Sequence, residues 1–108
     1  MTEGKLVSDI IHAIYPYVRC FRINVGTVTT STGHKFSSGA PKGYTDISGH
    51  RRGDGRAVYI EAKLDYNDAS EKQIEFINEA KRDGAIAGVC RNADEALRLV
   101  TEGFNTEG

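Results

Sequence analysis

Apolar side chains recur at spacings of three and four over residues 3–15, where Leu6, Ile10 and Ile14 fall on one side of the chain. This spacing predicts an amphipathic helix. Pro16 follows the pattern and is expected to end it, because proline removes a helical hydrogen bond.

Residues 56–64, with the sequence RAVYIEAKL, give the strongest strand signal in the chain. Apolar and polar residues alternate there, and the β-branched and aromatic residues favour extended backbone. Further strands are predicted at 18–26, 44–48 and 85–91. The Thr-, Ser- and Gly-rich stretch 27–43 predicts a β-ribbon with a turn near Gly33 and then a loop.

Two more helices are predicted after the strong strand. The first covers 71–83, where Ser70 and Gln73 have the spacing of a capping box and a glycine follows. The second covers 93–102, and the last six or so residues are expected to be disordered. The order α-β-β-β-α-β-α predicts a single α/β domain over residues 1–108, with helices on the faces of a mixed sheet.

Composition adds limits to this picture. The chain has 108 residues, of which 39% are hydrophobic and 27% charged, as in one small globular domain. No apolar run approaches the ~20 residues of a membrane span. The N-terminus has no secretion pattern, and Cys20 and Cys90 form neither a disulfide framework nor a zinc motif. We therefore expect a cytoplasmic protein without a membrane partner or a small-molecule cofactor.

The net charge of −1 conceals an uneven distribution. Residues 1–63 carry nine Lys and Arg against five Asp and Glu, whereas residues 64–108 carry five against ten. This asymmetry is compatible with ordinary solvated surface, or with one side that faces a polyanion and an acidic back.

Three charged residues lie where the chain could perform chemistry. Glu61 and Lys63 are two residues apart on the predicted strand and therefore share a face. Asp46 precedes Glu61 by fifteen residues on a short strand, and a hairpin would bring it beside Glu61. Taken alone, the Glu–Lys pair is equally explained as a surface ion pair worth ~0–1 kcal/mol.

Two adjacent carboxylates repel each other, and a hard divalent cation is the usual compensation. We expect Asp46, Glu61 and the backbone carbonyl of Ala62 to hold Mg²⁺ or Mn²⁺. The metal would polarise a phosphoryl oxygen and activate water. Lys63 would orient that water and stabilise the charge that develops on the phosphorus.

With these residues in place, the chain resembles the VRR-NUC (virus-type replication-repair nuclease) family of the PD-(D/E)xK nuclease superfamily. The resemblance spans about residues 3–100. It is carried by Glu3 at the first helix, RINVG at 22–26, GYTDISG at 43–49, YIEAK at 59–63, Ser70 with Gln73, and GAIAGVCRN at 84–92. Thr45 stands where the superfamily motif has a proline.

The resemblance implies a restriction-endonuclease-like core in which Asp46 and Glu61 are metal ligands and Lys63 is the catalytic lysine. It places Glu3 in the acidic position of the first helix, which faces the metal and would contact it through a water. It places Gln73 beside the active site. Each has a plainer explanation. Glu3 is favoured at a helix N-terminus by the dipole, and Gln73 belongs to a capping box, a role that can coexist with the first.

Other residues offer contacts to DNA without chemistry, although each alone is also explained as plain surface. They are basic or amide side chains of the basic half, on a strand, in a Gly/Ser loop or in a tight turn: Arg22, Asn24, Lys35, Lys42, Arg51 and Arg52. The three histidines lack the spacing of a zinc site.

The expected function is a metal-dependent DNA endonuclease. Small stand-alone members of the family resemble phage proteins that act as homodimers on branched DNA such as four-way (Holliday) junctions, in DNA repair and recombination. Three alternatives remain open. They are a non-catalytic DNA-binding or assembly module with the same fold, a nuclease acting on flaps, duplexes or RNA, and a small-molecule phosphodiesterase.

Overall fold

The computed structural model of the chain describes residues 1–23, 27–29, 33, 35–37 and 43–106. Its helices are α1 (Glu3–Ile14), α2 (Glu71–Arg82) and α3 (Ala93–Thr106). Its strands are β1 (Val18–Arg22), β2 (Thr27–Thr29), β3 (Lys35–Ser37), β4 (Ile47–Arg51), β5 (Ala57–Ala62) and β6 (Ile86–Cys90).

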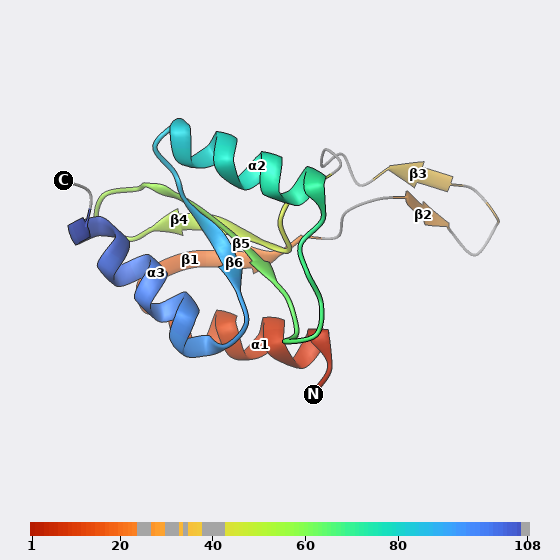
Figure 1. Cartoon of the computed structure of the whole chain (residues 1–108), viewed down its shortest axis with the longest axis horizontal. Helices are drawn as coiled ribbons and strands as arrows, with labels where there is room; N and C mark the ends of the chain where they lie inside the picture. Colours follow the sequence, from red (N-terminus) through yellow and green to blue (C-terminus); the bar gives the residue numbers. More distant parts are fainter. Residues whose placement is uncertain (24–26, 30–32, 34, 38–42, 107–108) are drawn as a thin grey trace.

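Four strands form a mixed sheet in the order β1-β4-β5-β6. The β1–β4 and β4–β5 pairs are antiparallel, and β5 pairs with β6 in parallel. Helices α1 and α3 lie on one side of this sheet and α2 lies on the other (Figure 1). The α/β class and the mixed sheet flanked by helices are therefore confirmed.

The main core lies between the sheet and the α1–α3 pair. Because strand side chains alternate, Val58, Ile60 and Ala62 of β5 all point into it. Helix α1 contributes Leu6, Ile10 and Ile14, the same spacing that predicted the helix. A smaller cluster around Ile77, Ala80 and Ala87 joins α2 to the other side of β5 and β6.

Strand β4 lies three residues later than predicted. Residues 44–48 were expected in the strand and 49–55 in a turn, but the strand covers Ile47–Arg51. Gly49 lies inside it because a Cβ there would stand 2.0 Å from the Arg19 carbonyl oxygen of β1. The glycine allows two strands to approach each other and does not mark a turn.

The ribbon prediction is confirmed in its described part, since β2 and β3 pair antiparallel with Gly33 between them at φ 87°. The prediction for the C-terminus is wrong, because α3 continues to Thr106 instead of ending at 102. A helix that is already packed through Val100 gains one hydrogen bond for each added residue. Within the described residues, no helix is long and apolar enough to cross a bilayer.

Candidate active site

Asp46 and Glu61 meet where the β4–β5 ladder ends. The ladder pairs Ile47 with Ile60, so the next residues outward are Asp46 and Glu61. Each carboxylate accepts a hydrogen bond from the other strand: Glu61 Oε1 from the Asp46 N–H at 3.2 Å, and Asp46 Oδ2 from the Ala62 N–H at 3.2 Å. The predicted juxtaposition of these two acids is present.

Glu61 is buried, with an exposed fraction of 1%. Burial is the largest cause that raises the pKa of its carboxyl group, to about 7, and the adjacent Asp46 carboxylate raises it further. The Lys63 ammonium and the Asp46 N–H act in the opposite direction without cancelling the shift. Glu61 is therefore a buried acid whose negative charge is only partly compensated.

Lys63 supplies the cation nearest to this acid. Its Nζ lies 3.5 Å from Glu61 Oε2, and its side chain is 17% exposed, against 2% for that of Glu61. The backbone N–H of Lys63 donates to the Cys90 carbonyl of β6, which fixes the chain at the end of β5. The ammonium is thus held between the buried acid and solvent, in reach of a substrate.

Gln73 reaches the same acid from α2. Its side-chain amide donates to Glu61 Oε2 at 2.9 Å. Its carbonyl oxygen accepts from the Ser70 N–H at 2.8 Å, and its own N–H donates to the Ser70 hydroxyl, which completes the capping box. The capping box and the hydrogen bond to Glu61 coexist, and the cap fixes the amide that holds Glu61.

The donor set suits a hard cation. Asp46 and Glu61 present carboxylate oxygens side by side, the pairing that Mg²⁺ and Mn²⁺ prefer. The Ala62 N–H points to Asp46, and the carbonyl of a strand residue leaves on the same side as its N–H, so the Ala62 carbonyl also faces this edge. Among the described residues, no group of three or more His, Cys, Asp or Glu is placed to hold a metal.

A scan against protein-family models finds no match for this chain, and neither does a search of curated proteins.

Glu3 lies at the same end of the sheet as Asp46 and Glu61, but α1 is on the other side of the sheet. Helix α1 runs antiparallel to β1, so its first turn lies near the end of β1, where the Arg22 guanidinium approaches Gly4. Within the described residues, no hydrogen bond or ion pair joins Glu3 to Asp46, Glu61 or Lys63. Its role in the site stays a prediction.

The expected DNA-contacting residues divide into three groups. Arg22 is exposed at the same end of the sheet as the acids. Arg52 lies beyond the opposite end of β4, where it donates to the Tyr15 carbonyl. Asn24 and Lys42 lie outside the described residues, as does the side chain of Lys35.

Arg51 is not part of an exposed turn, and its prediction as a DNA contact is corrected. Its side chain is 7% exposed at the end of β4. It pairs with Asp54 and donates to the Val100 carbonyl of α3 at 3.1 Å. The guanidinium therefore joins the sheet to α3 and does not face a phosphate backbone.

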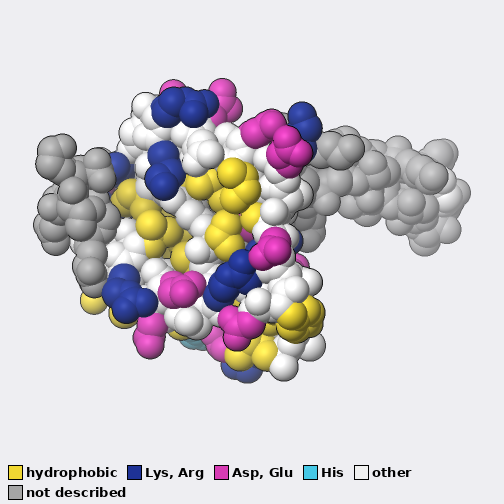
Figure 2. Space-filling model, in the orientation of Figure 1, with side chains coloured by type: hydrophobic (Ala, Val, Ile, Leu, Met, Phe, Trp, Pro, Cys, Tyr) yellow, Lys and Arg dark blue, Asp and Glu magenta, His cyan; other side chains and the backbone are white. Residues whose placement is uncertain are grey.

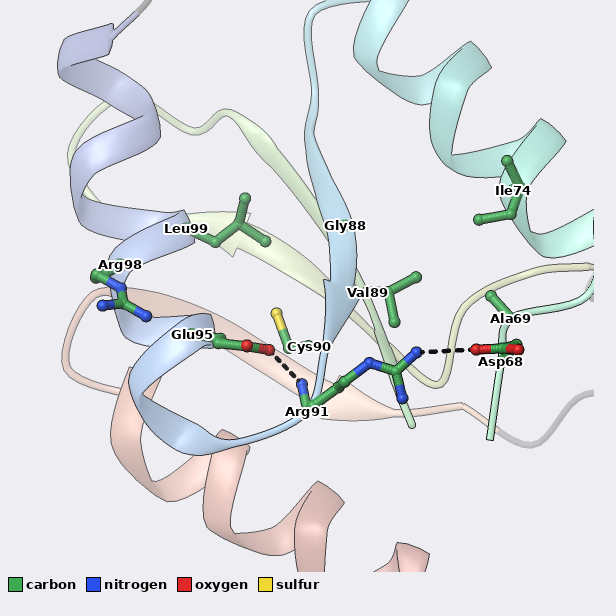
Figure 3. Close-up of a pocket in the computed structure, with 10 residues that line it drawn as sticks. All are labelled: Asp68, Ala69, Ile74, Gly88, Val89, Cys90, Arg91, Glu95, Arg98 and Leu99. Atoms are coloured by element: carbon green, nitrogen blue, oxygen red, sulfur yellow. Dashed lines mark hydrogen bonds and ion pairs between the residues drawn. The ribbon is translucent and has the colours of Figure 1, made fainter. Parts of the chain in front are cut away.

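Arg91 supports the site in a way that the sequence did not reveal. Its guanidinium donates to the carbonyls of Leu64 and Asn67, at 2.7 and 2.6 Å, and pairs with Asp68 at 3.4 Å. These contacts fix the loop that connects Lys63 to the capping box, and Figure 3 shows the Arg91–Asp68 pair. An arginine directly after a buried strand was the only signal.

A hollow of about 690 Å³ lies beside Arg91, along the outer edge of β6. Figure 2 shows apolar surface here between α2 and α3, with charged side chains around it. The one thiol in its lining is Cys90, and burial followed by the charge of Glu95 raises the pKa of that thiol to about 12. The thiol is therefore protonated at neutral pH and is not an activated nucleophile.

Proposed function

We propose that this protein is a metal-dependent nuclease that hydrolyses phosphodiester bonds at Asp46, Glu61 and Lys63. The observation that carries the proposal is a buried acid with a pKa raised to about 7, adjacent to a second acid and held by Lys63 and Gln73. Acids with strongly raised pKa values collect at functional sites. A divalent cation would compensate the Glu61 charge, which burial disfavours first and the adjacent Asp46 carboxylate second.

The residues have distinct tasks in this scheme. Asp46 and Glu61 would hold Mg²⁺ or Mn²⁺, which supplies Lewis-acid activation of the phosphodiester and of the attacking water. Gln73 keeps Glu61 Oε2 in place through its amide. Lys63 places a positive charge at the solvent side of Glu61, where it orients water and stabilises the extra charge on the phosphoryl group.

The fold and the motif agree with the resemblance to the VRR-NUC family, and we propose a restriction-endonuclease-like core. Thr45 takes the position of the superfamily proline. It is fully buried, and its hydroxyl donates to the Ile47 carbonyl at 3.2 Å, so it holds the turn before β4. The resemblance supports branched DNA as the substrate and a homodimer that cuts two strands of a symmetric junction.

The test is cleavage of a labelled four-way junction and of a matched linear duplex, in Mg²⁺, in Mn²⁺ and in EDTA. We expect paired nicks on the junction with either metal, none in EDTA, and none with Lys63→Ala. Thermal unfolding checks that the variant is folded. Junction binding without cleavage in either metal would overturn the proposal in favour of a non-catalytic DNA-binding module.

A further inference from the structure

One side of the sheet is only half covered by helix. Helix α2 packs on β5 and β6, through Ile77, Ala80 and Ala87. The part of the sheet that α2 covers ends at the middle strands, where the Phe76 and Tyr44 ring centres lie 4.7 Å apart. Beyond that contact, the same side of β1 and the neighbouring part of β4 have no helix over them among the described residues.

Three exposed side chains of β1 and β4 lie on this half, and we call them the β1 surface: Arg19, Phe21 and His50. Strand alternation places them there, because their neighbours Val18 and Cys20 are buried in the core on the other side. Arg19 pairs across the strands with His50, and Phe21 with Ser48. All three are exposed, and Phe21 is 58% exposed.

The β1 surface is continuous with the candidate active site. Ser48, the cross-strand partner of Phe21, lies two residues from Asp46, which directly precedes β4 and exchanges hydrogen bonds with Glu61 and Ala62 of β5. Two residues along a strand span about 7 Å. Glu61 and Lys63 also lie on this side, so a chain bound over Phe21 would be one nucleotide step from the acids.

Strand β1 carries two arginines and no acid, and the acids of the candidate site lie beyond its Arg22 end. No Asp or Glu occurs between Asp9 and Asp46, a stretch that includes all of β1. Arg19 donates to the Tyr15 hydroxyl at 2.8 Å and forms no ion pair with an acid within the described residues. The Arg52 guanidinium lies 4.8 Å from the Tyr15 ring centre, so a second cation lies near the start of β1.

We propose that the β1 surface binds a single unpaired nucleic-acid strand, with a base on the Phe21 ring and a phosphate at Arg19. A duplex keeps its bases stacked inside, so cations alone would suffice for it. An exposed ring beside cations is what an unstacked base requires, and such stacking is tolerant of sequence. The inference rests on the proposed function and goes beyond it: a four-way junction is fully paired, and the β1 surface adds an unpaired strand, such as a flap, to the substrates that this nuclease would take.

The test measures binding without cleavage. Fluorescence anisotropy in EDTA follows a labelled twelve-nucleotide single strand, as DNA and as RNA, and the matching DNA duplex, against wild type, Phe21→Ala and Arg19→Gln. We expect Phe21→Ala to weaken single-strand binding about tenfold and to change duplex binding little. Arg19→Gln should weaken both and reduce the salt dependence. The DNA and RNA arms show which sugar the surface accepts.

Ile74→Ala is the matched control, because Ile74 is another exposed apolar residue, 42% exposed, on α2. We expect it to bind as wild type does, with unchanged thermal unfolding in all variants. Equal single-strand affinity for Phe21→Ala and wild type would overturn the proposal. So would a Phe21→Ala variant that binds normally but changes from dimer to monomer in sedimentation, since a second copy would then cover the ring.

The two proposals fail separately. If Phe21-dependent strand binding is found but no cleavage occurs in either metal, the β1 surface stands and the nuclease assignment falls. If Lys63-dependent cleavage occurs and Phe21→Ala has no effect on strand binding, the nuclease stands and the β1 surface falls.

Discussion

The two ends of the β4–β5 hairpin each bury one charged side chain, but they surround it in opposite ways. At the turn, Arg51 is 7% exposed and its guanidinium is paired with Asp54 and bonded to the Val100 carbonyl. At the open end, Glu61 is 1% exposed and lies beside another acid.

The pKa values of the acids at the two ends are shifted in opposite directions. Hydrogen bonds from Arg51 are the largest cause that lowers the pKa of Asp54, to about 2, so this pair stabilises its own charges. Burial and Asp46 raise the pKa of Glu61 to about 7, so the negative charge of Glu61 at the open end is not fully compensated. The Arg51 end compensates its own charges within the chain, whereas the acid pair at the open end has the charge pattern of the metal site that we propose.

The largest expected effect comes from removing one acid at each end. Asp46→Asn should lower metal-dependent junction cleavage at least about a hundredfold, because it removes a proposed metal ligand. Asp54→Asn is the matched control and should cut within about twofold of wild type once folded. Comparable losses in both variants, measured in the same cleavage assay, would remove the functional distinction between the two ends.

The pH dependence of stability should differ in sign between the ends. In metal-free buffer the folded protein holds the Glu61 proton more tightly than the unfolded chain does. The free energy of unfolding should therefore fall as the pH rises from 4.5 to about 7, by about 2–3 kcal/mol. At the Arg51 end, stability should be lost as the pH falls from 3.8 to about 2.

Urea unfolding at a series of pH values measures both trends. Glu61→Gln should remove the decrease in the free energy of unfolding between pH 4.5 and about 7. It should leave unchanged the decrease at acidic pH, which comes from Asp54. A wild-type stability that rises over the upper range would show that Glu61 is compensated in the folded protein.

Much of the site follows from local pattern. Strand alternation placed Glu61 and Lys63 on one side of β5, and a hairpin with a glycine-rich turn placed Asp46 beside them. The Ser70–Gln73 spacing predicted the cap that the structure contains. These features depend on the periodicity of one strand and on contacts three residues apart, which a sequence displays directly.

The features that were missed depend on other parts of the chain. Gly49 was interpreted as part of a turn because the approach of β1 to its α-carbon is a tertiary contact. Arg51 was assigned to the surface because its partner carbonyl, Val100, is 49 residues away. The burial of Glu61 and the Arg91 contacts with the loop after β5 likewise arise only once strands and helices are packed.

The most direct test of the central claim is an NMR titration of the Glu61 side-chain carboxyl carbon, with and without saturating Mg²⁺. Asp54 serves as the internal reference. We expect Glu61 to titrate with a midpoint at about pH 7 without metal, and this midpoint to decrease clearly with Mg²⁺. The Asp54 midpoint should stay at about pH 2 in both conditions. A Glu61 curve that does not change when Mg²⁺ is added would contradict the claim that these two acids form a metal site.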